Sequence, residues 1–149
     1  MPRFRFNLEV LLEQRERIEQ QKQRAVAELE LQRLRIEETI RMHQQRITHE
    51  RLQQRSLLLA GDVGGARSQS AAAVRVAATA QKAVFELSAV HARLEVARAE
   101  LLEAAKRRKV IELLRERRVE EWKREQNRLE AAATDELAVI KAAGLREIP

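Results

Sequence analysis

The stretch Ala60-Gly61-Asp62-Val63-Gly64-Gly65-Ala66-Arg67-Ser68, written AGDVGGARS, holds three of the four glycines of this chain. Such a stretch could bind a phosphate or turn the chain around. A P-loop needs the pattern GxxxxGK[ST], in which backbone amides, a lysine and a hydroxyl hold the phosphates and magnesium. Here the basic residue is Arg67, and the preceding LQQRSLLLA reads as the end of a helix and not as a strand. The stretch therefore predicts a glycine hinge over residues 60–68.

Helical patterns flank this hinge on both sides. Before it, apolar or small residues recur at intervals of threes and fours up to Leu59, as in the a/d seam of a coiled coil. After it, Ser68 or Ser70 can cap a second helix, and Gly144 can terminate it. We expect helix 1 at about residues 5–59 and a longer helix 2 at about residues 69–143.

Two amphipathic helices joined by a short loop are expected to fold back on each other. With a loop centred on Gly64 and Gly65, facing residues have numbers that sum to about 130. The two seams agree with this register, which places Leu29 opposite Leu101. The sequence thus predicts an all-α fold, a long two-helix antiparallel coiled-coil hairpin that forms a single domain over residues 1–149.

The unequal lengths of the two helices predict an unpaired end. Helix 1 runs out of partners near Phe4, opposite about position 126. The segment from Asn127 to Ala143 is then expected to project as a single helix of roughly 25 Å. Because it carries several large apolar residues, it is expected to need a covering partner.

The composition agrees with long exposed helices. Of the 149 residues, 35% are charged and only 3% are aromatic, which is too few aromatic residues for an ordinary globular core. The absence of cysteine excludes disulfides, thiol catalysis and cysteine-based metal sites. No signal peptide and no apolar run of the roughly 18 residues needed for a membrane span is recognised. We expect a soluble, cytoplasmic protein.

The sequence contains no recognisable catalytic or metal-binding pattern. His43, His49 and His91 lack the spacing that zinc proteases require, and no serine or threonine has a matching His/Asp pair. A narrow two-helix hairpin also lacks the concave pocket of a small-molecule site. The sequence therefore predicts no enzyme, no cofactor and no metal.

The strongest charge feature is the segment from Lys106 to Arg124, which has nine basic and four acidic residues and so accounts for most of the net charge of +6. Three interpretations of this segment are open: a solvated helix face without a partner, a surface that binds an acidic protein, and a surface that binds nucleic acid. The basic arm of a leucine zipper precedes a continuous zipper and is not paired with another helix, which disfavours DNA.

Three blocks of the sequence resemble a known family. They are FRFNLEVLLEQRERIEQQ from Phe4, AKRRKVIELLRERRVEEWKRE from Ala105 and TDELAVIKAA from Thr134. The first is similar to the F-x-F-x-L-x-x-L-L start of the FliJ family of flagellar type III export proteins. The second resembles the family's ERKxLExL-like block, and the third its D-E-x-A motif.

This resemblance implies a non-enzymatic export component similar to the γ stalk of rotary ATPases. Such a stalk inserts into a hexameric export ATPase (FliI-like), contacts the cytoplasmic domain of the export-gate protein (FlhA-like) and handles export chaperones, at the cytoplasmic face of the inner membrane. Injectisome stalk relatives (YscO-like) share the architecture and stay open. A different hypothesis is a basic coiled coil that binds nucleic acid or self-associates as a structural rod.

Two sets of residues are expected to carry these contacts. The ATPase-binding set joins a basic collar to the unpaired end: Arg117, Arg118, Trp122, Lys123, Arg124, Leu129, Asp135, Glu136, Leu137 and Ile140. The export-gate-binding set is a stripe on helix 1 that is expected to be exposed and has no aromatic residue: Thr39, His43, Arg46 and Glu50.

Overall fold

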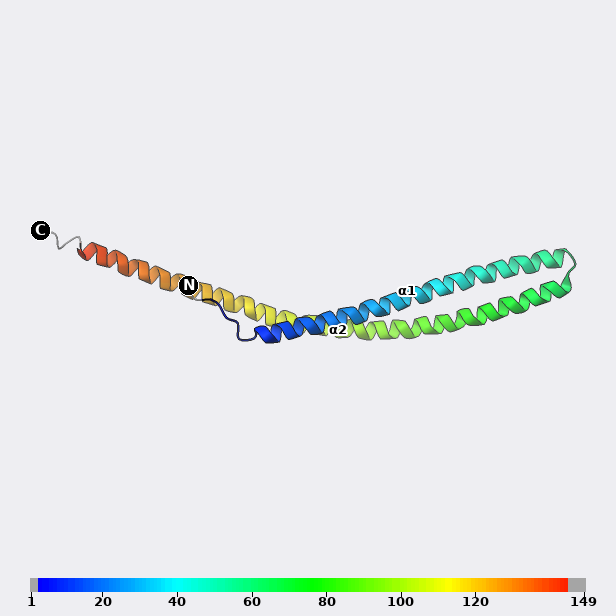
Figure 1. The fold of residues 1–149 in the computed structure, drawn as a ribbon, viewed down its shortest axis with the longest axis horizontal. Coiled ribbons are helices and arrows are strands. Elements are labelled where there is room, and N and C mark those ends of the chain that lie inside the picture. The colour runs from blue at the N-terminus through cyan, green and yellow to red at the C-terminus, as the bar shows by residue number, and fades with distance from the viewer. Residues whose placement is uncertain (1–2, 145–149) are drawn as a thin grey trace. The chain divides into compact units, whose positions relative to one another are not determined.

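The computed structural model describes residues 3–144, with side chains through residue 141. Within this range the chain forms two helices and no strand: α1 spans Glu9–Leu59 and α2 spans Val63–Gly144. Figure 1 shows the two helices side by side and joined by a short turn, with α2 the longer. The predicted all-α, two-helix antiparallel hairpin is therefore confirmed.

The chain divides into two compact units, and each contains part of both helices. The turn unit is Glu19–Glu103, and the terminal unit combines Met1–Ile18 with Ala104–Pro149. Each unit is described by itself. The single domain expected over residues 1–149 stays a prediction.

The turn between the helices is shorter than the hinge predicted over residues 60–68. Gly61 has φ +80°, the left-handed conformation that favours glycine. The amide of Gly61 donates to the carbonyl of Leu58 (3.1 Å), and the amide of Asp62 donates to the carbonyl of Leu57 (3.0 Å). These two bonds are those of a Schellman motif, which satisfies the last carbonyls of α1. The turn is therefore complete within three residues, Ala60 to Asp62.

The second helix begins earlier than predicted because Asp62 caps it, and not Ser68 or Ser70. The Oδ1 atom of Asp62 accepts a hydrogen bond from the amide of Gly65 (2.9 Å). The backbone carbonyl of Asp62 accepts the first hydrogen bond of the helix, from the amide of Ala66 (3.1 Å). An aspartate in this position satisfies an amide that has no partner inside the helix. Gly64 and Gly65 consequently lie in the first turn of α2 without positive φ.

In the turn unit, the core is a narrow seam whose buried residues on α2 recur at intervals of seven and four. Val76, Ala83, Val90 and Leu94 are buried, and Val90 and Leu94 are only 2% and 1% exposed. The apolar partners on α1, such as Ile36, are half-buried. This is the spacing of a coiled-coil seam.

The register of the hairpin differs from the predicted one. Lys22 Nζ contacts Glu100 Oε2 at 2.6 Å, and Gln69 donates to both Glu50 and Gln53. Because the turn centres on Gly61, facing residues have numbers that sum to about 122 and not 130. The predicted register is therefore wrong by about one heptad, and Leu29 does not face Leu101.

In the terminal unit, the first helical turn begins at Glu9 and not near residue 5. Residues 3–6 are not helical, and the carbonyl of Phe6 accepts a bond from the amide of Glu9 (3.2 Å). The rings of Phe4 and Trp122 contact each other with centroids 6.0 Å apart. Glu9 Oε2 also pairs with Arg115 Nε at 3.1 Å. These contacts hold the N-terminal segment on α2.

Candidate protein-docking site

The end of α2 after residue 126 has no second helix beside it in the described part of the chain. We name residues 127–141 the C-terminal extension, which is the orange to red end of α2 in Figure 1. Every side chain of the extension is exposed, as predicted for the unpaired end. Four large apolar side chains on it, Leu129, Leu137, Val139 and Ile140, are between 51% and 67% exposed. Leu129, Leu137 and Ile140 recur at helical spacing and so lie along one face.

The two acidic residues of the predicted site lie beside this apolar face. Asp135 and Glu136 line a shallow depression together with Val139 and Ile140. The extension therefore presents apolar and acidic groups next to one another on a single helix.

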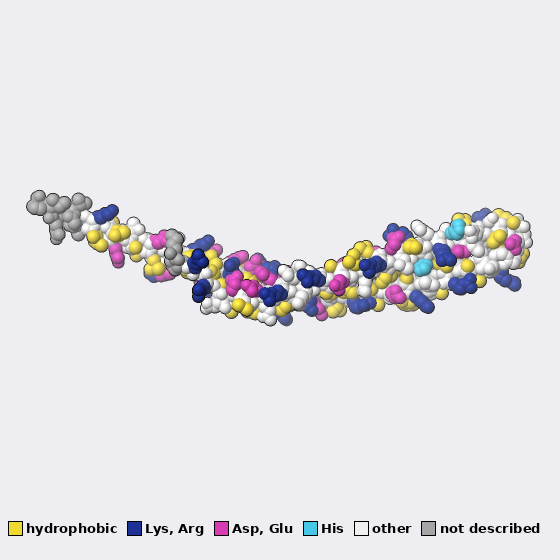
Figure 2. Space-filling model, viewed as in Figure 1, with side chains coloured by type: hydrophobic (Ala, Val, Ile, Leu, Met, Phe, Trp, Pro, Cys, Tyr) yellow, Lys and Arg dark blue, Asp and Glu magenta, His cyan; other side chains and the backbone are white. Residues whose placement is uncertain are grey.

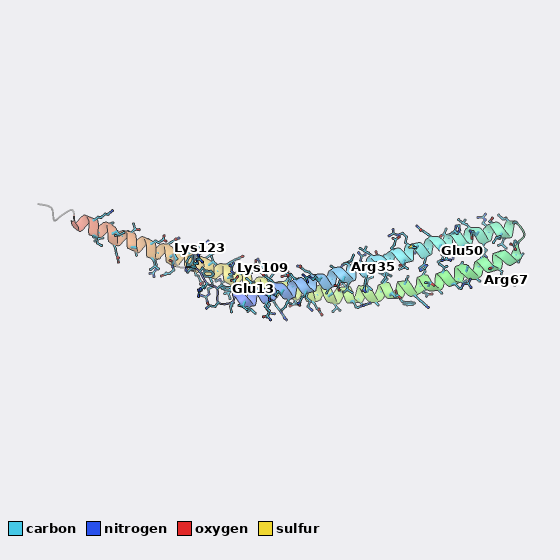
Figure 3. The ribbon with its side chains drawn as sticks, viewed as in Figure 1. Glu13, Arg35, Glu50, Arg67, Lys109 and Lys123 are labelled. Atoms are coloured by element: carbon cyan, nitrogen blue, oxygen red, sulfur yellow. The ribbon has the colours of Figure 1, made fainter. Side chains whose placement is uncertain are left out.

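The predicted basic collar consists of Arg117, Arg118, Lys123 and Arg124, and only half of it is available to a partner. Arg118 Nη1 pairs with Glu121 Oε2 at 3.1 Å, and Arg124 Nη2 pairs with Glu120 Oε2 at 3.7 Å. Arg117 and Lys123 are exposed and have no ion pair among the described residues. The collar cations best placed to meet an acidic surface are therefore Arg117 and Lys123, the second of which is labelled in Figure 3.

Trp122 has a role within the chain. It is half-buried, and its ring packs against Phe4. The two rings line a depression of about 610 Å³ with Phe6, Leu8 and Leu114 among its walls. Sequence reasoning missed this depression, although the spacing of Phe4, Phe6 and Leu8 was the available signal.

The predicted gate-binding stripe on α1 is not uniformly exposed. Thr39 and Arg46 are exposed, but His43 is half-buried and Glu50 is only 9% exposed. His43 and Glu50 lie seven residues apart in the seam, where they face α2. Glu50, labelled in Figure 3, accepts a hydrogen bond from Gln69 and contacts Arg46 Nε at 3.6 Å. The expectation that the whole stripe is exposed was therefore wrong for His43 and Glu50.

Two residues of this stripe line a groove between the helices in the turn unit. His43 and Arg46 of α1 line it together with Arg75, Val76 and Thr79 of α2. Only the part of the stripe around Thr39 and Arg46 therefore offers accessible side chains.

The basic segment from Lys106 to Arg124 is interleaved with carboxylates. Arg108 and Lys109 both contact Glu112 Oε2, at 2.8 and 2.9 Å. The hydrogen bond from Lys109 is the main cause that lowers the pKa of Glu112. Figure 2 shows basic and acidic side chains mixed along the surface. The segment is thus partly neutralised by its own glutamates, as expected of a solvated helix face.

Within the described part of the chain, no group of three or more histidine or acidic side chains is arranged to hold a metal ion. No described helix has a stretch long and apolar enough to cross a membrane.

These features define a class of protein: an antiparallel coiled-coil hairpin whose second helix ends in an exposed, partly apolar extension. The family model described as "Flagellar FliJ protein" matches residues 4–146, which is nearly the whole chain. The chain therefore belongs to the FliJ family, and its role is related to flagellar protein export. No curated protein and no solved structure matches the chain.

Proposed function

We propose that this protein is the stalk of a flagellar export ATPase and couples that enzyme to the export gate. The C-terminal extension inserts into the central hole of a hexameric FliI-like ATPase. The remainder of the hairpin contacts the cytoplasmic domain of a FlhA-like gate protein and receives export chaperones. The protein itself has no catalytic role, and it works in the cytoplasm, where its partners hold it at the inner membrane.

The observation that carries the proposal is the exposed C-terminal extension. A single helix with its side chains is about 10–12 Å wide, which suits the narrow centre of a ring. Covering an apolar side chain stabilises a complex by about 25 cal/mol for each Å² removed from water. Leu129, Leu137 and Ile140 provide such a face, with Asp135 and Glu136 beside it.

The basic collar supports the same orientation. Arg117 and Lys123 lie a few residues before the extension and have no ion pair among the described residues. Acidic groups at the mouth of a ring would attract them, which accelerates association more than it strengthens the final complex. For the gate, the proposed contacts are the exposed residues Thr39 and Arg46, the second of which lines the groove in the turn unit.

The test uses the full chain with Leu137→Glu and Ile140→Glu combined, and measures stimulation of ATP hydrolysis by a FliI-like hexamer. We expect stimulation to be lost, because two charges would replace the apolar face inside the ring. The matched control combines Leu31→Glu with Val84→Glu, which lie on the turn unit and are similarly exposed, at 54% and 51%. Circular dichroism checks that both variants keep their helices.

A second pair of substitutions tests which end enters the ring. Leu59 and Val63 are the exposed apolar residues at the turn, 81% and 65% exposed. If Leu59→Glu with Val63→Glu abolished stimulation while the extension variant stimulated fully, the turn would be the inserted end. The proposed orientation would then be wrong.

A further inference from the structure

A second apolar seam runs along α2 in the turn unit, on the outside of the hairpin. Its members are spaced by four and three residues, as in a coiled-coil seam: Phe85, Ala89, Ala92, Val96 and Ala99. All five are exposed, and the largest, Phe85 and Val96, are 69% and 61% exposed. Phe85 is also the sole aromatic residue between positions 19 and 103. We name this set the outer seam.

The outer seam lies away from α1. At 100° per residue, its centre is about 160° around the helix from the buried seam of Ala83, Val90 and Leu94. A helix that is apolar on two opposite sides is typical of one packed between two neighbours. In the described chain, α1 covers one of these sides, and nothing covers the other.

Two charged residues on one side of the outer seam have no ion pair within the described chain, whereas Glu95 and Glu100, which also flank the seam, pair with Arg98 and Lys22. Glu86 and Arg93 flank it on one side and form no ion pair with a described residue. They border a groove between the helices that is also lined by Ile36 and by Arg35, which Figure 3 labels on α1. A third helix lying on the outer seam would therefore meet a cation and an anion one heptad apart.

We propose that the outer seam binds the outer seam of a second copy of this chain, with the two α2 helices antiparallel. The interface then consists of layers of facing side chains. Phe85 faces Val96 of the second copy in one layer, and Ala89 faces Ala92 of the second copy in the next. Glu86 lies between these two layers, opposite Arg93 of the second copy. Because a two-fold contact repeats each pair, the dimer forms two Glu86–Arg93 ion pairs.

The charges favour this orientation over a parallel one. In a parallel, in-register pair of helices, a residue that flanks the seam on one copy faces the residue five positions further along on the second copy. That arrangement places Glu95 against Glu100 of the second copy, twice, and it loses both Glu86–Arg93 pairs. Like charges brought together in this way destabilise a coiled coil. This interface is independent of the C-terminal extension and so goes beyond the proposed stalk function.

The test measures self-association of the full chain by sedimentation equilibrium. We expect the unaltered protein to form a reversible dimer. Glu86→Arg alone and Arg93→Glu alone each turn two attractive pairs into two repulsive ones. Each variant by itself should therefore dimerise roughly tenfold more weakly, given the small energy of each exposed pair.

Mixing the two variants distinguishes this pairing from any other. In a mixed dimer, Glu86→Arg on one copy faces Arg93→Glu on the other, and the two unaltered residues face each other as well. Association should therefore return to the level of the unaltered protein. A charge change at a distant exposed position, Glu16→Arg, is the matched control and should leave the dimer unchanged.

Three results would overturn the proposal. One is an unaltered protein that stays monomeric at all concentrations, which would assign the outer seam to a different protein. The second is a dimer that forms equally well with Glu86→Arg, and the third is a mixture that associates no better than its components. Either of the last two would place any self-association at another surface.

Discussion

At the scale of single residues, the glycines of the turn have different physical roles. Gly61 adopts positive φ, where any other residue would be strained. A Cβ atom on Gly64 would meet only Asp62 Oδ1, at an ordinary contact distance of 3.7 Å. A Cβ atom on Gly65 would lie 2.9 Å from Asp62 Cγ, and closer still to one carboxylate oxygen. Gly65 therefore makes room for the aspartate that caps α2.

This difference predicts unequal effects of two similar substitutions on stability. Gly64→Ala should stabilise the hairpin by up to about 1 kcal/mol, because alanine favours helix more than glycine does. Gly65→Ala gains the same preference but displaces the cap, which costs about 1 kcal/mol. The free energy of unfolding in urea, followed by circular dichroism, should therefore be higher for Gly64→Ala by about 1 kcal/mol.

The cap itself supplies the control. In an Asp62→Ala background there is no carboxylate to displace, so the two alanine variants should become equally stable. A gap that persisted without Asp62 would contradict this explanation of Gly65.

At the scale of the helices, an ion cluster in the turn unit links α1 to α2. Glu30 accepts from Arg33 Nε (2.7 Å) on its own helix and from Arg98 Nη2 (2.5 Å) on the other. Arg33 also donates to Glu37 at 2.8 Å. The hydrogen bond from Arg33, followed by that from Arg98, lowers the pKa of Glu30 below its ordinary value. The charged form of Glu30 is therefore the one that stabilises the folded hairpin.

The sign of the pH dependence follows from this shift. A carboxylate whose pKa is lowered by folding contributes stability above its unfolded pKa, about 4.3 for glutamate, and loses it as the pH falls through the folded value. Unaltered protein should thus be more stable than Glu30→Gln near neutral pH, and this gap should shrink below about pH 4. Urea unfolding at several pH values measures the gap.

The control for Glu30→Gln is a substitution of a glutamate that belongs to no ion cluster. Glu28 is exposed and has no hydrogen bond or ion pair among the described residues. The gap between unaltered protein and Glu28→Gln should stay small at every pH. If Glu28→Gln and Glu30→Gln gave the same pH profile, the cluster would have no measurable role in joining the helices.

At the scale of the whole molecule, a net charge of +6 should accelerate association with an acidic ring. Under the proposed function, the local collar matters more than the total charge. Arg117→Glu with Lys123→Glu should slow association with the ATPase about tenfold at low salt and weaken its salt dependence. Stopped-flow binding at several salt concentrations measures both effects.

The control changes the total charge by the same amount in the turn unit. Arg55 and Arg67 are exposed in the turn unit and form no ion pair with a described residue. Arg55→Glu with Arg67→Glu should leave the association rate nearly unchanged. Equal slowing by both pairs would show that total charge, and not the collar, directs the encounter.

Sequence alone determined the kind of fold and where the candidate site lies. Apolar residues recur at intervals of three and four, and a glycine-rich stretch interrupts this repeat once. The pattern therefore predicts two helices joined by a turn. Because α2 has more residues than α1 can cover, the extension after Asn127 also followed from the sequence. These features depend on local pattern and chain length, which are visible without any tertiary contact.

Only the tertiary structure decided the register and the fine structure of the site. A turn centred on Gly61 in place of Gly64 and Gly65 shifts the facing residues by about one heptad. Such a shift brings seam positions opposite seam positions again, so the heptad pattern cannot distinguish the two registers. The Schellman bonds of the turn, the Asp62 cap and the buried contact of Glu50 with Gln69 distinguish them. The hydrogen bond from Gln69 also placed Glu50 in the seam. Arg117, in the terminal unit, has no ion pair among the described residues, because side-chain pairing depends on which residues face each other.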